Sequence, residues 1–150
     1  MTIAEQLLDD MKASMKAKDA LTLSVIRSLR SAISYAAIDR SGPDGSLTDQ
    51  EVIAVIRKEI KKRQDSVASY ESAKRQDLAD AERAEIGVLE RYLPAGLTAE
   101  QLIELVAGVI AELGATTRKE MGAVMKLANE RAAGRADGRA LSAEVSKRLS

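Results

Sequence analysis

The stretch that decides the fold is residues 48–72, TDQEVIAVIRKEIKKRQDSVASYES. Thr48 and Glu51 have the spacing of a capping box, in which the side chains of the two residues satisfy backbone N–H groups at a helix start. The apolar residues that follow recur every three or four positions, the period of one helix face: Val52, Val55, Ile56, Ile60, Val67 and Tyr70. At 1.5 Å per residue this helix would span roughly 40 Å, long enough to be the spine of the N-terminal half.

The same signals recur on both sides of this stretch. Further capping-box spacings predict helix starts at Thr2 with Glu5, Thr98 with Gln101, and Thr117 with Glu120. The chain has three tyrosines and neither tryptophan nor phenylalanine, and a composition this poor in aromatics favours helices over sheets. We therefore expect an all-α protein whose other helices cover residues 3–18, 19–39, 78–93, 99–113, 118–133 and 139–149.

The segment Pro94-Ala95-Gly96 follows the fourth expected helix and divides the chain. Proline cannot donate a backbone hydrogen bond and disfavours helical backbone in the residue before it, so it predicts a boundary. The sequence therefore predicts a four-helix N-terminal subdomain over residues 1–93 and a three-helix subdomain over residues 94–150.

The composition argues against a self-contained enzyme. The chain contains no histidine and no cysteine, so the usual general base, the commonest metal ligand and all thiol chemistry are missing. No serine stands in a nucleophile elbow, and residues 134–138 lack the lysine and threonine of a phosphate-binding P-loop. We expect no catalytic residue, no metal and no cofactor, although an enzyme that uses lysine and carboxylates alone stays open as an alternative.

Charge and targeting signals point to a protein without a membrane or secretory route. The chain balances 23 basic against 23 acidic residues, so any contact with RNA must rest on a local patch rather than on net charge. The start of the chain lacks the basic and apolar segments of a secretory signal, and no apolar run approaches the roughly 18 residues of a membrane span. We expect a cytoplasmic location.

The densest basic cluster lies in the middle of the long helix, at Arg57, Lys58, Lys61 and Lys62. Such a cluster is usually a solvated helix face, and Glu59 and Arg63 have the i to i+4 spacing of an ion pair. The four cations nevertheless stack one turn apart in like-charge pairs, an arrangement that an RNA backbone would stabilise. Both interpretations stay open.

A second candidate site surrounds the loop Gly134-Arg135-Ala136-Asp137-Gly138. Gly134 suits the left-handed residue past a helix end, and Asp137 suits the cap of the next helix, so the loop could be a plain turn. The alternative is an anion site at the start of that helix. Its candidate residues are Gly134, Gly138, Arg135 and Arg139, with Lys119, Lys126 and Arg131 on the preceding helix.

The preceding helix also carries Met121-Gly122-Ala123-Val124-Met125. Its apolar residues have the spacing of a core face. Gly122 costs roughly 1 kcal/mol in a helix interior, so we expect a neighbouring helix or an RNA backbone to approach it closely.

These two motifs together resemble the tail domain that the B subunit of the tRNA-dependent amidotransferase (GatB) shares with the small YqeY-like proteins. The resemblance to the YqeY branch covers nearly the whole chain. One departure is Lys74, where that family more often has glycine. The further matching segments are Leu29, Arg30, residues 32–33, residues 61–66, Tyr70, residues 77–79 and residues 92–94.

The resemblance implies a tRNA-binding or tRNA-associated accessory module of the amidotransferase system, with a GatB-tail-like second subdomain and no active site of its own. A family label for carbon–nitrogen ligase activity with glutamine as amide donor would belong to the full amidotransferase. Amidotransferase or synthetase subunits are possible partners besides tRNA. The alternative from another class is a helical protein–protein adaptor that binds no RNA.

Overall fold

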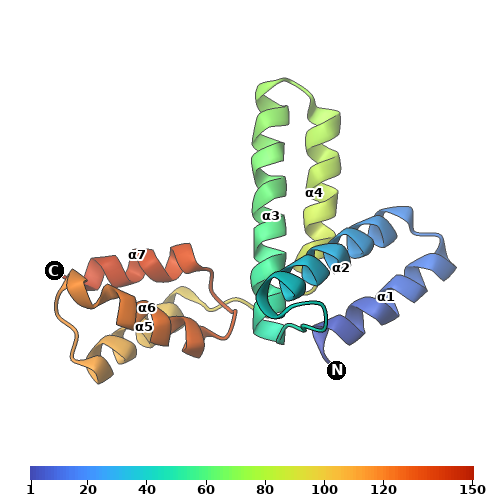
Figure 1. Cartoon of the computed structure of the whole chain (residues 1–150). Coiled ribbons are helices and arrows are strands. Elements are labelled where there is room, and N and C mark those ends of the chain that lie inside the picture. The colour runs from blue at the N-terminus through green and yellow to red at the C-terminus, as the bar shows by residue number, and fades with distance from the viewer. The chain divides into compact units, whose positions relative to one another are not determined.

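The computed structural model describes residues 1–150 and contains seven α-helices, one 3-10 turn and no strand (Figure 1). The all-α prediction is therefore confirmed. The chain divides into two compact units, Met1–Leu93 and Pro94–Ser150. Each unit has its own cluster of buried apolar side chains.

The first unit consists of two helical hairpins. Helices α1 (Ile3–Ala17) and α2 (Ala20–Ser41) form one, and α3 (Asp49–Ser72) and α4 (Gln76–Glu90) form the other. Figure 1 shows α3 and α4 side by side as a projecting arm, and these two helices make the most extensive contact in the chain. The core lies at the base of the arm, where both hairpins contribute Leu7, Val25, Ile26, Leu29, Val52, Ile56, Ile60, Val88 and Leu89.

The last turn of the first unit is fixed by a buried tyrosine. The Tyr92 hydroxyl donates a hydrogen bond of 2.5 Å to the Asp10 carboxylate on α1. Burial and the neighbouring carboxylate both raise the pKa of Tyr92 above its usual value, so the phenol keeps its proton. This contact ties the segment after α4 back to the first helix.

Three of the four predicted capping boxes are confirmed. Thr2, Thr48 and Thr98 each accept the backbone N–H three residues on, at 3.1–3.3 Å, and each partner side chain returns a bond to the cap N–H. The box at Thr117 is wrong, since this side chain caps nothing. The N–H of Glu120 instead donates to the Thr117 carbonyl at 3.1 Å and closes a 3-10 turn, η1 (Arg118–Glu120).

The tip of the arm contains a strained residue. Lys74 has φ +59°, in the left-handed region. The N–H groups of Lys74 and Arg75 close the end of α3 by donating to the carbonyls of Glu71 and Tyr70 at 3.0 and 2.8 Å. A left-handed conformation costs a residue with a β-carbon about 1–2 kcal/mol, so glycine would suit this position better.

The second unit packs three helices, α5 (Ala99–Leu113), α6 (Met121–Ala132) and α7 (Gly138–Arg148), around small side chains. The α6–α7 loop behaves as expected. Gly134 has φ +81°, and the Asp137 carboxylate accepts the N–H of Ala140 at 2.7 Å at the start of α7. The residues that form this core are Val106, Val109, Ala115, Val124, Ala128, Ala132, Leu141, Val145 and Leu149.

Candidate nucleic-acid interface

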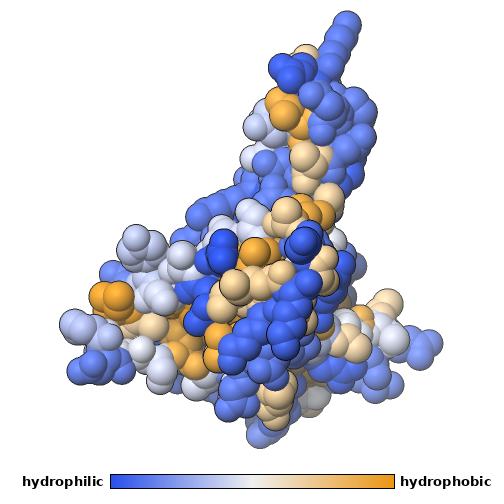
Figure 2. Space-filling model, turned by 90° about the vertical axis from the view of Figure 1, so that its right-hand side faces the viewer, coloured by the Kyte–Doolittle hydropathy of each residue, from blue (hydrophilic) through white to orange (hydrophobic).

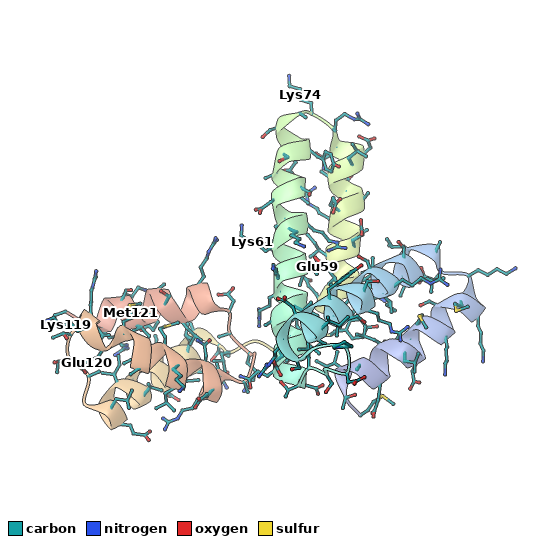
Figure 3. All side chains as sticks on the ribbon, in the orientation of Figure 1. Glu59, Lys61, Lys74, Lys119, Glu120 and Met121 are labelled. Carbon is teal, nitrogen blue, oxygen red and sulfur yellow. The ribbon has the colours of Figure 1, made fainter.

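Two of the candidate cations stand on the outer face of the α6 region. Lys119 lies in η1 and Lys126 lies seven residues later in α6, a separation of about two helical turns. Both side chains are exposed, and neither forms an ion pair within the chain. Figure 3 shows Lys119 projecting away from its helical turn. Their charges are therefore available to an external anion.

A third available cation is Arg139, the second residue of α7. Its side chain is exposed and forms no ion pair within the chain. The first turn of a helix carries partial positive charge from its unpaired N–H groups. Gly138 opens this turn, and a β-carbon built there would meet no atom within 4 Å. An approaching phosphate would thus meet open backbone beside the Arg139 guanidinium.

Arg135 and Arg131, by contrast, bind within the unit. The Nε of Arg135 donates to the carbonyl of Ala95 at 2.9 Å, and the Arg135 carbonyl accepts the N–H of Leu97 at 3.0 Å. Arg131 forms an ion pair with Glu112 on α5. The structure therefore separates the two arginines of the loop: Arg135 holds the 94–97 segment, and Arg139 faces solvent.

The methionine-bracketed segment of α6 is part of the core. Val124 is fully buried, and Met121 and Met125 pack against the same cluster. The expected close approach of a neighbouring helix to Gly122 is wrong, since a β-carbon at this position would have no neighbour within 4 Å. Gly122 lies in the first turn of α6 and is exposed, so nothing within the chain compensates for its low helix propensity.

The basic cluster of α3 is largely neutralised by the unit itself. Lys61 pairs with Asp65 at 2.8 Å, and Lys62 pairs with Glu59 at 3.5 Å. The expected pair of Arg63 with Glu59 is present at 3.7 Å, and Arg63 also reaches Glu85 on α4 at 3.4 Å. The side chains of Arg63 and Glu59 are only 13% and 14% exposed, and the contact of Arg63 with Glu85 joins α3 to α4.

The remaining two cations of the α3 cluster differ in exposure. Arg57 is half-buried, whereas Lys58 is exposed. Figure 3 labels Glu59 and Lys61 on the same helix, and Figure 2 shows that hydrophilic residues cover most of the arm. Of the four cations of the α3 cluster, Lys58 is the exposed one that forms no ion pair within the chain.

Sequence reasoning placed no functional residue on α2, yet Tyr35 on this helix is 76% exposed. Arg27 and Arg30 lie eight and five residues earlier on α2 and line the same groove as Tyr35. The signal in the sequence was a tyrosine within eight residues of two arginines, in a chain with almost no other aromatics.

The comparisons with known proteins identify the family. The family described as "Yqey-like protein" matches residues 4–149. The chain belongs to the YqeY-like family. This agrees with the resemblance carried by its motifs, and the match extends across both structural units.

Curated relatives of this YqeY-like protein are fungal proteins named "Altered inheritance of mitochondria protein 41, mitochondrial". The one from Clavispora lusitaniae is 31% identical over 124 residues, which cover 81% of this chain and 71% of the relative. Those from Meyerozyma guilliermondii and Kluyveromyces lactis are 37% and 38% identical over 56% and 57% of this chain, but these matches span only 42% and 45% of the relatives.

The relatives' names bear on the expected location. They describe those proteins as mitochondrial, so a cytoplasmic location for this YqeY-like protein stays a prediction. Among its seven helices, none combines the length and the apolar composition that a bilayer crossing requires.

Proposed function

We propose that this protein is a tRNA-binding accessory module related to the glutamine-dependent tRNA amidotransferase system, and that its C-terminal unit contacts the RNA. The observation that carries the proposal is the presence of three exposed cations in this unit, Lys119, Lys126 and Arg139, none of which forms an ion pair within the chain. In this proposal any carbon–nitrogen ligase activity belongs to a partner, and the chain itself has no histidine or cysteine.

The charge distribution of the C-terminal unit supports phosphate binding. The acidic side chains that neutralise other cations are already engaged: Glu112 binds Arg131, and Glu144 binds Arg148 at 2.9 Å. Asp137 caps α7. Two acidic residues would limit the affinity: Glu120 directly follows Lys119, and Glu130 lies one turn after Lys126 on the same exposed side of α6. We therefore expect a moderate, salt-sensitive interaction with the phosphate backbone.

A helical adaptor for a protein partner, such as an amidotransferase or synthetase subunit, is the second candidate. It is favoured by Leu8 and Met15, which lie two turns apart on one stripe of α1 and are both exposed. An apolar interface weakens little with salt, whereas each phosphate contact adds to the salt dependence.

Fluorescence anisotropy of labelled tRNA, measured from low to physiological salt, tests the proposal. We expect K119E/K126E/R139E to abolish binding at physiological salt. Neutralising the same three residues should reduce the slope of log affinity against log salt by about 1 for each phosphate contact. The matched control is K61E/R75E/R83E, which changes the net charge equally on the α3–α4 arm, where each cation has an acidic partner.

Equal loss of binding in the two triple variants would mean that net charge, and not the three cations of the C-terminal unit, governs the interaction. No binding of tRNA by the wild-type protein at low salt would favour the adaptor. Circular dichroism of both variants shows whether the helix content is intact.

A further inference from the structure

Two open grooves run along α2 within the first unit, and Tyr35 lines both. The groove between α1 and α2 has a volume of about 780 Å³, and the groove between α2 and α3 has a volume of about 640 Å³. Both volumes fall in the range of roughly 300–1,000 Å³ that is usual for ligand sites. Neither groove is lined by a residue of the C-terminal unit.

The exposure of Tyr35 is unusual for this chain. The other two tyrosines are Tyr92, which is buried, and Tyr70, which is half-buried, and there is no tryptophan or phenylalanine. Tyr35 leaves 76% of its surface in solvent, so the core gains little from it. An exposed aromatic ring beside cations is the arrangement on which unpaired bases stack.

The groove between α1 and α2 is basic and contains no acidic side chain. Its lining combines Arg27, Arg30 and Tyr35 with two methionines and two serines. Arg27 and Arg30 form no ion pair within the chain, and the Nη1 of Arg30 donates a hydrogen bond to the sulfur of Met11 at 3.2 Å. Two guanidinium groups without a carboxylate partner favour phosphate, and the serine hydroxyls can donate hydrogen bonds to phosphate or sugar oxygens.

The second groove continues the basic track but with less charge. Lys58 and Lys62 line it, together with Asp39 and Glu59. Glu59 already holds Lys62 at 3.5 Å, and Asp39 would repel a phosphate. The charge complementarity therefore favours the groove between α1 and α2 for the phosphates, with Tyr35 at its border.

We propose that the groove between α1 and α2 binds an unpaired RNA segment, with a base stacked on Tyr35 and the adjoining phosphates held by Arg27 and Arg30. Duplex RNA buries its bases in the stack, so the site would select single-stranded loops or ends. This inference extends the proposed function, because it adds a single-strand surface on the first unit to the cations of the C-terminal unit.

The test is anisotropy of the full-length protein with labelled oligouridine, oligothymidine of equal length and a matched RNA duplex. We expect Y35A to weaken oligouridine binding about 5- to 150-fold and to leave duplex binding unchanged, whereas Y35F should keep wild-type affinity. R27Q/R30Q should lower the salt slope for oligouridine by about 1.4, at 0.7 for each phosphate. Tyr35 and both arginines are exposed, so these variants should keep their helix content.

The possible outcomes separate this inference from the proposed function. Binding of tRNA that depends on Arg139, without any binding of oligouridine at low salt, would overturn the inference and leave the proposed function standing. Oligouridine binding that Y35A does not weaken would also overturn it. Oligouridine binding that needs Tyr35 but survives K119E/K126E/R139E would support a separate single-strand site, whatever the fate of the tRNA proposal. Preference for oligothymidine over oligouridine would contradict the assignment to RNA.

Discussion

The basic residues of α3 and those of the C-terminal unit look alike in the sequence but are used differently. The α3 cluster is denser, yet Lys61, Lys62 and Arg63 each bind a carboxylate of the same unit. In the C-terminal unit the cations are more widely spaced along the chain, and Lys119 and Arg139 form no ion pair within it. The comparison teaches that the pairing of charges in the fold, and not their density in the sequence, indicates which surface can bind an anion.

Replacing Arg63 should have the largest effect on stability. Arg63→Ala leaves the half-buried carboxylate of Glu85 without its partner and leaves Glu59 with Lys62 alone, so we expect a loss of about 1–3 kcal/mol in the free energy of unfolding. Its affinity for tRNA should not change. Urea unfolding measures the first quantity and anisotropy the second. Lys61→Ala is the control, because its exposed pair with Asp65 should contribute no more than about 0.5 kcal/mol. A stable Arg63→Ala protein that binds tRNA weakly would break the comparison.

The two arginines of the α6–α7 loop should show the same contrast at a smaller scale. Arg135→Ala removes the hydrogen bond to Ala95, and we expect the C-terminal unit to lose about 1 kcal/mol of stability. Arg139→Ala, with an exposed side chain and no internal partner, should leave stability unchanged and weaken tRNA binding. Unfolding and anisotropy measurements on both variants decide the assignment. If Arg139→Ala destabilises the protein as much as Arg135→Ala does, Arg139 has a structural role that the fold does not reveal.

The smallest effect concerns the tip of the arm, where Lys74 adopts a left-handed backbone (Figure 3). Lys74→Gly removes the steric cost of the β-carbon and should stabilise the protein by about 0.5–1 kcal/mol. Lys74→Ala keeps the β-carbon and should bring no such gain. The two midpoints of thermal unfolding are compared directly, and equal values would show that backbone strain at this residue is negligible. Because Lys74 has no ion pair, RNA binding through it would appear as weaker tRNA affinity in both variants alike.

Local patterns predicted most of the fold. The helices followed from apolar residues repeated every three or four positions, and Asp137 was predicted as a cap because its partner, Ala140, lies three residues away. The capping box predicted at Thr117 was wrong because the N–H of Glu120, which the box requires as a donor to the Thr117 side chain, binds the Thr117 backbone carbonyl instead. Competition of this kind depends on the path of the backbone, which the residue types do not specify.

The candidate site was harder to predict because its properties depend on distant residues. The sequence favoured Arg135 and Arg139 equally, but Ala95, the partner of Arg135, lies 40 residues earlier. The exposure of Tyr35 likewise depends on how α1 and α3 flank α2, whose residues Ile26, Leu29 and Ala37 are buried. Long-range contacts therefore decided which polar and aromatic residues remained at the surface.

The contact between Arg135 and Ala95 also bears on the order in which the C-terminal unit folds. It closes a loop of 40 residues that contains the whole of α5 and α6. Closing a loop lowers the conformational entropy of the chain before the contact contributes any favourable free energy. The cost falls once α5 and α6 have paired, since they bring the two ends together. The 94–97 segment should thus be the last part of this unit to dock during folding and the first to detach. The N–H of Leu97 should then exchange with solvent before the backbone N–H groups of α5 and α6.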